Sequence, residues 1–267
     1  MILSRRVLLN GQYLGQQNAA IVVRSVEAGA PRSDAQMTPL MSGVGQRITS
    51  LSWSELVVTV RFAIDIPKRQ LSARQQAYEA ACAWALSGRG KWLSVGHMPG
   101  RRLYVDRVEI ADPADLWEWT NDYTFMFHAV SVPFWQDQVP AHGTYGMTPL
   151  TGTEYTGDFA MNIPGQFRSV LDVSIRNDTQ SELPSLTIST GVSTITLTGL
   201  SLPESKLLII SHTDEGLLQI TENGVDAYGK QAPGGSTDLY VDPGAQTISI
   251  TADRAIAIDL YCCGRYA

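Results

Sequence analysis

The chain has 267 residues, of which 44% are hydrophobic and 17% are charged, and its formal net charge is −6. This length suits two domains, and the composition is that of a globular protein. The apolar run after Arg6 is too short for a secretory signal, and no run approaches the ~20 residues of a membrane helix. The sequence therefore predicts a soluble, unexported protein with no membrane partner.

Charge and tryptophan divide the chain near Trp135. Up to that residue there are 14 basic and 11 acidic residues, and beyond it 6 and 15; all six tryptophans lie in the first part. Residues 136–166 are rich in Gly, Pro and Thr and lack periodicity, as connecting segments do. We predict a first domain over 1–135, a linker or arm over 136–166 and a second domain over 167–267.

The first part begins with two predicted strands. Residues 3–11 end in an Asn10-Gly11 hairpin turn pair, and residues 19–26 form the second strand. Residues 27–46 break the pattern and predict a long loop or a hairpin arm. The clearest strand covers residues 55–67, where Leu56, Val58, Val60, Phe62, Ile64 and Ile66 alternate with more polar residues.

One helix follows Pro67. Ser72 and Gln75 have the spacing of a capping box, and Gly88 is suited to the residue after the helix. The apolar face consists of Tyr78, Ala81, Cys82 and Ala85. We predict a helix over 72–87 that packs across the sheet.

Three more strands are predicted, over residues 91–96, 101–110 and 121–132. The third carries Tyr123, Phe125, Phe127 and Ala129 on one side and Met126, His128, Val130 and Val132 on the other. Both sides are largely apolar, which predicts a central strand or an interface. The candidate interface residues are Tyr123, Phe125, Phe127 and His128.

This strand runs into Pro133, Phe134 and Trp135. A proline has no N–H to donate, so we expect it to end the strand's pairing. The two aromatic side chains then act as an anchor that holds the chain's exit against the domain core, a burial of roughly 3–6 kcal/mol in transfer terms. Substituting Trp135 by alanine is predicted to detach this exit segment.

The second part reads as strand after strand, with turn signals every 8–12 residues, as in an antiparallel sandwich or barrel. Asn223-Gly224 and Pro243-Gly244 mark explicit turns. The predicted strands cover residues 169–177, 185–190, 193–199, 206–211, 216–224, 237–244, 246–252 and 255–264. The fold class is therefore mainly β: a β-rich domain with one helix, followed by a β-sandwich.

Motifs for chemistry are weak. The four histidines are scattered, the three cysteines have no metal-binding spacing, and the glycines of Ser87–Lys91 follow a helix rather than a strand. No basic stripe points to sequence-specific nucleic-acid binding. The acidic loop with Asp112, Asp115, Glu118 and Asp122 reads as a solvated loop. We predict no catalytic, cofactor-binding or metal-binding residue.

The order of elements in the first part resembles the distal tail protein (Dit) family of long-tailed, siphovirus-type bacteriophages. The resemblance rests on four stretches: "ELVVTVRFAID" running into the helix, "GRGKWLSVG" with Trp92, "HMPGRRLYVDRVEI" with Pro99, Arg101 or Arg102, and Tyr104, and "FMFHAVSVPFWQD". It covers about the first 135 residues. It implies that Trp92, Pro99, Arg101, Tyr104, Pro133, Phe134 and Trp135 are structural anchors.

The resemblance also implies a non-enzymatic role in the phage tail tip, or baseplate, used in host attachment. Members form a six-fold ring through their first, belt domains, and a galectin-like sandwich projects outward. The ring joins the tail tube protein to the tail-tip hub and lets DNA pass. Such a protein is a virion component that assembles in the host cytoplasm and needs no cofactor.

Two other functions fit the same two domains. A carbohydrate-binding adaptor for host surface glycans would stack sugar rings on exposed aromatic faces. Without tryptophan, the second part would have to use tyrosines, namely Tyr145, Tyr155, Tyr228, Tyr240, Tyr261 and Tyr266. A hydrolase with an accessory sandwich would need two carboxylates that are distant in sequence and close in space.

Overall fold

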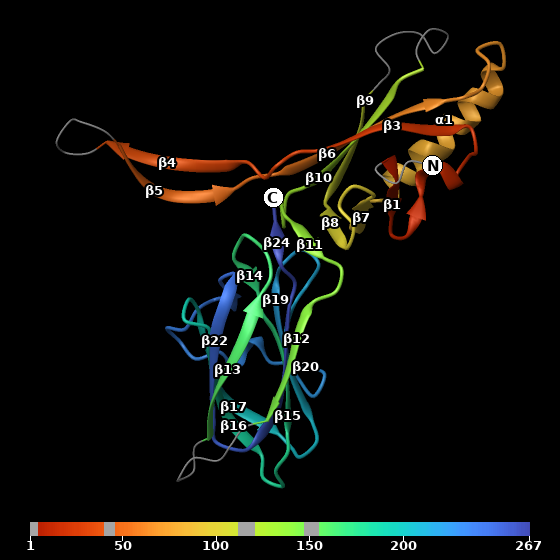
Figure 1. Ribbon diagram of the computed structural model, residues 1–267. Coiled ribbons are helices and arrows are strands. Elements are labelled where there is room, and N and C mark those ends of the chain that lie inside the picture. Colours follow the sequence, from red (N-terminus) through yellow and green to blue (C-terminus); the bar gives the residue numbers. More distant parts are fainter. Residues whose placement is uncertain (1–4, 40–45, 112–120, 147–154) are drawn as a thin grey trace. The chain divides into compact units, whose positions relative to one another are not determined.

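The computed structural model describes residues 5–39, 46–111, 121–146 and 155–267. The chain divides into two compact units, Met1–Trp135 with Ala267, and Gln136–Tyr266. Each unit has its own set of buried side chains, and the strands of both are drawn in Figure 1. The fold is mainly β, as predicted. No helix among the described residues is long and apolar enough to cross a membrane.

Unit 1 is built on a four-stranded antiparallel sheet in the order β3-β6-β10-β9. The strands are β3 (Ile21–Ala28), β6 (Leu56–Ile64), β10 (Tyr123–Ala129) and β9 (Arg107–Ala111). The alternation predicted for β6 is confirmed, because Leu56, Val58, Val60, Phe62 and Ile64 are all fully buried. The long aromatic strand β10 lies inside the sheet, between β6 and β9, as its two apolar sides predict.

Helix α1 (Leu71–Leu86) covers the buried face of this sheet. The ring of Trp84 meets Phe127 edge-on at 5.9 Å, and Tyr78 lies 5.1 Å from Tyr123. Arg74 is also buried, and its guanidinium donates to the carbonyl of Ile66 and to the Tyr123 hydroxyl. The predicted packing of the helix across the sheet is therefore confirmed.

The predicted helix ends are wrong in detail. The N-cap is Gln70, without a side-chain cap, and Ser72 lies inside the first turn. Gln75 bonds to Glu79 one turn later instead of closing a capping box. Gly88 does not take the left-handed conformation, which falls on Gly90 (φ 71°) just before β7. The buried stripe also differs from the predicted face: it consists of Arg74, Ala77, Ala81, Trp84 and Ala85.

Unit 1 also contributes four adjacent strands to another sheet, in the order β2-β1-β7-β8: β1 (Val7–Leu9), β2 (Gln12–Tyr13), β7 (Lys91–Val95) and β8 (Arg101–Val105). Asn10 and Gly11 both have positive φ, 47° and 81°, so the predicted hairpin turn joins β1 to β2. A short 3-10 turn, η2 (Leu14–Gln16), follows.

Residues 101–110, predicted as one strand, form two strands in different sheets. The break is at Asp106, whose carboxylate accepts hydrogen bonds from the backbone N–H groups of Val130 and Ser131 and from the Ser131 hydroxyl. These bonds hold the chain where it crosses from β8 to β9. An isolated Asp inside an apolar alternation gives no sign of such a crossing, which is why the sequence missed it.

Strand β10 ends at Ala129, before Pro133, so the proline does not terminate the pairing. Around and after this proline, Val132, Pro133, Phe134 and Trp135 are all buried, and their role as an anchor stays a prediction. Strand β11 (Trp135–Asp137) then leads from unit 1 into unit 2.

Within residues 27–46, the described residues 33–39 form one strand of a β-hairpin. Strand β4 (Ser33–Pro39) pairs antiparallel with β5 (Gln46–Trp53) as an isolated two-stranded sheet, with a bulge between Gln36 and Met37. In Figure 1 the pair extends away from the other strands of unit 1. Of the two structures that the sequence allowed, the hairpin arm is the observed one.

Unit 2 is an antiparallel sandwich. One sheet has the order β12-β23-β15-β18-β19-β20 and the other β13-β22-β16-β17. The first consists of β12 (Ala141–Gly146), β23 (Ile256–Cys262), β15 (Asp172–Asn177), β18 (Leu207–His212), β19 (Leu218–Glu222) and β20 (Val225–Asp226). The second consists of β13 (Tyr155–Ile163), β22 (Gly244–Ala252), β16 (Leu183–Ser189) and β17 (Thr194–Leu202).

Apolar side chains from both sheets form one continuous core. Smaller elements complete the unit: β14 (Ser169–Val170) pairs with β21 (Tyr240–Val241), and η3 (Tyr228–Lys230) and β24 (Arg265–Tyr266) are three and two residues long. The described part of residues 136–166 departs from the predicted linker. It supplies β12 and β13, one strand to each sheet. The sequence did not predict these strands because Gly and Thr interrupt their alternation of apolar and polar residues.

Candidate functional site

The most unusual feature of unit 1 is the exposure of the β4–β5 hairpin. All seven residues of β4 are exposed, so none of the other described residues covers either side of this strand. A two-stranded hairpin on its own is marginally stable in water. The arm is therefore a candidate for contact with another molecule.

The two sides of the hairpin have different chemistry. Register pairs Met37 with Ile48 and Ser33 with Trp53, and side chains of paired residues lie on the same side. That side, which we call the apolar arm face, carries Ala35, Met37, Pro39, Ile48 and Trp53. Met37, Ile48 and Trp53 are 57%, 56% and 39% exposed. The opposite side carries Asp34, Gln36, Thr38, Arg47, Ser50 and Ser52.

The root of the hairpin contacts the anchor segment. The indole of Trp53 and the ring of Phe134 meet at 72°, with centroids 5.7 Å apart. Next to them, Ser54 bonds through both its N–H and its hydroxyl to the carbonyl of Arg32, which closes the base of the arm. The base is thus held by packing and hydrogen bonds, whereas the rest of the arm has only its own ladder.

Three of the four candidate interface residues lie in the interior of unit 1. Tyr123, Phe125 and Phe127 are at most 1% exposed and face α1. Phe62 stacks on two of them, at 5.3 Å from Tyr123 and 4.7 Å from Phe125. These rings form the core of one copy and are not available to a neighbouring copy. The sequence could not separate a core strand from an interface strand, because both are apolar.

His128, the fourth, lies on the other side of β10, where it is held by two carboxylates. Its Nδ1 is 2.8 Å from Glu55 Oε2 and its Nε2 is 3.4 Å from Glu109 Oε2. The hydrogen bond from His128 lowers the pKa of Glu55, and the nearby Arg107 acts in the same direction. The imidazole is buried; its Nδ1 is bonded within the chain, whereas its Nε2 makes no hydrogen bond among the described residues.

The anchors predicted in β7 and β8 come together only in part. Trp92 meets Tyr104 edge-on at 5.4 Å, and the guanidinium of Arg102 lies 3.9 Å from the Trp92 ring centroid. Arg101 is the neighbouring, half-exposed residue on β8, and Pro99 is exposed in the turn before it. Of the two arginines that the sequence offered, Arg102 is therefore the one that packs on the tryptophan.

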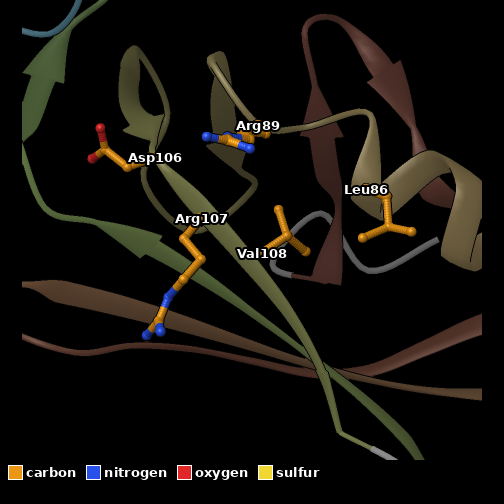
Figure 2. Close-up of a pocket in the computed structure, with 5 residues that line it drawn as sticks. All are labelled: Leu86, Arg89, Asp106, Arg107 and Val108. Carbon is orange, nitrogen blue, oxygen red and sulfur yellow. The ribbon is translucent and has the colours of Figure 1, made fainter.

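An open pocket of about 420 Å³ lies beside the end of α1 and is lined by Leu86, Arg89, Asp106, Arg107 and Val108 (Figure 2). Figure 2 shows Arg107 extending away from Leu86 and Val108. Both carboxylate oxygens of Asp106 are already bonded to residues 130 and 131. This lining holds no nucleophile beside a base. In the described part of the chain, no His, Cys, Asp and Glu side chains gather into a metal-binding group.

Unit 2 contains one buried ionic cluster, centred on His212. Its Nδ1 is 2.7 Å from Asp172 Oδ1 and its Nε2 is 2.6 Å from Asp238 Oδ1. Burial alone lowers the pKa of His212, but the two carboxylates outweigh it and the net pKa is raised. Both ring nitrogens are thus occupied, so the cluster offers no free base and reads as structural.

Comparison with solved structures shows the fold. The Dit protein of phage SPP1, described as a paradigm of the hub adsorption apparatus of phages that infect Gram-positive bacteria, aligns over 98% of this chain and 99% of its own, with a TM-score of 0.69 and 11% identity. The chain therefore has a Dit-like fold across both units.

Two chains from phage P2 baseplate structures also align. One, from the activated conformation with Ca, has a TM-score of 0.48 and 7% identity over 92% of this chain and 91% of its own. The other, with Sr, has a TM-score of 0.45 and 10% identity over 95% and 96%. The sequence matches no family model and no curated protein.

Proposed function

We propose that this chain is a non-enzymatic structural protein of a phage tail tip, and that copies of it associate through unit 1 into a closed ring. The observation that carries the proposal is the β4–β5 hairpin, whose apolar arm face is left exposed by the residues that the structure describes. The Dit-like fold supports the same role.

When the chain is alone, the apolar side chains of the arm stay in contact with water. Met37 and Ile48 are each more than half exposed, and covering such side chains contributes roughly 1–2 kcal/mol apiece. In a ring every copy offers one patch to a different patch of the next copy. We assign the apolar arm face as one patch and the outward side of β10, with Thr124 and Met126, as part of the region that receives it.

The remaining roles follow the family that the sequence resembles. The ring has six copies, joins the tail tube protein to the tail-tip hub, and leaves a channel for DNA. It is part of the virion and assembles in the host cytoplasm. In this assembly the buried Phe134 and Trp135 fix the root of the arm and the point at which the chain leaves unit 1.

The test is the mass of the full chain in solution, measured by native mass spectrometry and seen by negative-stain microscopy, alone and with the tail tube and hub proteins added. A ring of copies is expected, and Met37→Asp with Ile48→Asp should abolish it. The matched control is Gln36→Asp with Ser50→Asp, which adds the same charge to the polar side of the same hairpin. A chain that stays single-copy with its neighbours present would refute the ring, as would equal loss in both double variants.

The carbohydrate-binding alternative finds little support in unit 2. Of its six described tyrosines only Tyr228 is exposed, at 46%. Tyr145 packs on Phe159, and Tyr261 is stacked on His142 at 4.5 Å. A glycan array probed with the full chain separates the two functions, because selective sub-millimolar binding would favour the adaptor. The hydrolase alternative predicts activity on peptidoglycan that disappears when one carboxylate is removed.

A further inference from the structure

One side of the four adjacent strands β2-β1-β7-β8 carries arginines together with aromatic rings. The alternating residues Val7, Leu9, Leu93, Leu103 and Val105 are buried on the core side, so their neighbours face the other way. This outward side, which we call the Arg–Trp face, consists of Arg6, Leu8, Tyr13, Trp92, Ser94, Arg102 and Tyr104.

The cations of the Arg–Trp face have no counter-charge among the residues that the structure describes. Arg102 lies 3.9 Å over Trp92, and Arg6 lies 5.9 Å over Tyr13. Within the described residues, no carboxylate comes within ion-pair distance of either guanidinium, and the buried Nε of Arg102 has no hydrogen-bond acceptor. Elsewhere in unit 1 arginines do find acids, as Arg24 finds Asp122 at 3.3 Å. Within the described residues, the Arg–Trp face therefore presents two guanidinium groups that lie over aromatic rings and have no counter-charge.

A guanidinium held over an aromatic ring can keep its outer N–H groups free, and these can bind a carboxylate through two parallel hydrogen bonds. Arginine, tryptophan and tyrosine are also the residues that dominate binding energy at protein interfaces. We infer that the Arg–Trp face is a docking surface for a carboxylate-bearing segment of another protein, with Arg102 on Trp92 at its centre. This holds whether or not copies of the chain form a ring.

Nucleic acid would match the positive charge of the Arg–Trp face but not the arrangement of its aromatic rings. Proteins that bind single strands stack bases on free aromatic faces. Here Arg102 covers one face of Trp92, and Tyr104 is only 5% exposed. The Arg–Trp face therefore offers little free aromatic surface on which a base could stack. The partner also needs at least two carboxylates, because Arg6 and Arg102 lie on different strands, separated by β7.

The experiment is fluorescence anisotropy of a labelled oligo-glutamate peptide titrated with the full chain, beside an oligothymidylate of the same charge. Removing the two guanidiniums in Arg6→Met with Arg102→Met should weaken peptide binding about tenfold or more, as expected for loss of charge-assisted hydrogen bonds. Arg102→Lys keeps the charge but loses the fork, so an intermediate loss is expected. Each variant must keep the wild-type tryptophan-fluorescence melting transition, which a disrupted sheet would not.

The matched control is Arg47→Met with Arg69→Met, two exposed arginines of unit 1 that lie outside this sheet. It should stay within about twofold of wild type, since only net charge changes. An equal loss in the control would show that net charge alone binds the peptide and would overturn the inference. So would unchanged binding by the Arg6 and Arg102 variant, or tighter binding of the oligothymidylate than of the peptide. The ring is measured separately by mass, so either proposal can fail alone.

Discussion

Trp53, at the root of the β4–β5 hairpin, meets Phe134 of the anchor segment edge-on, with ring centroids 5.7 Å apart. The two residues are eighty-one positions apart in the sequence. Their contact joins the exposed arm to the buried stretch with which unit 1 ends. This contact explains an aromatic residue at position 134, because the ring of Phe134 packs against the root of the arm and is also buried in the core of unit 1.

Replacing Trp53 by alanine should loosen the arm more than it destabilises the unit. An edge-on aromatic pair contributes about 0.5–1.5 kcal/mol beyond area burial, and Trp53 is already 39% exposed. We expect faster hydrogen exchange over residues 33–39 and 46–53, with a small change in melting temperature. Trp53→Phe keeps a ring at the contact and should exchange almost as wild type does. Unchanged exchange in Trp53→Ala would mean that the contact does not hold the arm.

Trp135→Ala should be far more costly, because this side chain is fully buried. Loss of a buried Trp typically costs about 3–5 kcal/mol. The predicted result is a melting transition of unit 1 lowered by roughly 10 °C or more, together with loss of ring assembly.

Trp135→Phe is the comparison variant, since the indole Nε1 has no hydrogen-bond partner among the described residues. It keeps much of the buried area and removes this unpaired donor, so we expect a cost of about 1–2 kcal/mol. If Trp135→Ala melted and assembled as wild type does, the anchor would have no structural role.

Asn177 is the most demanding polar position of unit 2. Its side chain is fully buried, and its Nδ2 donates to the carbonyls of Ser181 and Leu202, both at 2.8 Å. Its Oδ1 accepts from the N–H and hydroxyl of Thr179. Asn177→Ala would remove these four hydrogen bonds from a buried position, at an expected cost of about 2–4 kcal/mol.

Calorimetry of the full chain measures this cost, and tryptophan fluorescence identifies the transition of unit 1, because all six tryptophans lie in residues 53–135. Only the other transition should fall in Asn177→Ala. Asn162→Ala, an exposed change on β13, should leave both in place. A shift in the tryptophan transition alone would contradict the assignment.

The stability of unit 2 should depend on pH through the His212 cluster. The raised pKa of His212 means that its contribution is complete below about pH 6.5 and is lost as pH rises through the higher folded-state value. Burial raises the pKa of Asp238, but the hydrogen bonds from His212 and Tyr240 lower it by more than burial raises it. The net pKa of Asp238 is therefore below its ordinary value. The contribution of Asp238 is therefore present above its ordinary pKa and is lost as pH falls through the lowered one.

These two directions predict greatest stability of unit 2 between about pH 4 and 6.5, with a decline on the alkaline side. His212→Gln should melt at a lower temperature in this range and lose the alkaline decline, as measured by calorimetry across pH. His142→Gln changes a histidine whose side chain is 46% exposed and should leave the alkaline decline in place. An alkaline decline that persisted in His212→Gln would assign it to another group, such as Tyr240 beside Asp238.

Much of the fold could be predicted from local pattern. Period-two alternation located β6, and the Asn10-Gly11 and Asn223-Gly224 pairs marked turns because their residues tolerate positive φ. The ends of elements were predicted less well. The helix begins at Leu71 rather than at a capping box, and residues 101–110 divide at Asp106, because a long-range hydrogen bond competes with local preference there.

The candidate site shows the same division. By itself the sequence determined that the chain is mainly β, that one helix covers a sheet of unit 1, and that Phe134 and Trp135 are buried, because periodicity and side-chain hydrophobicity act locally. Only the tertiary structure decided which apolar residues face inward and which face water. It placed Tyr123 and Phe127 under α1 and left Met37 and Ile48 in solvent, since burial depends on what the rest of the chain brings against each surface.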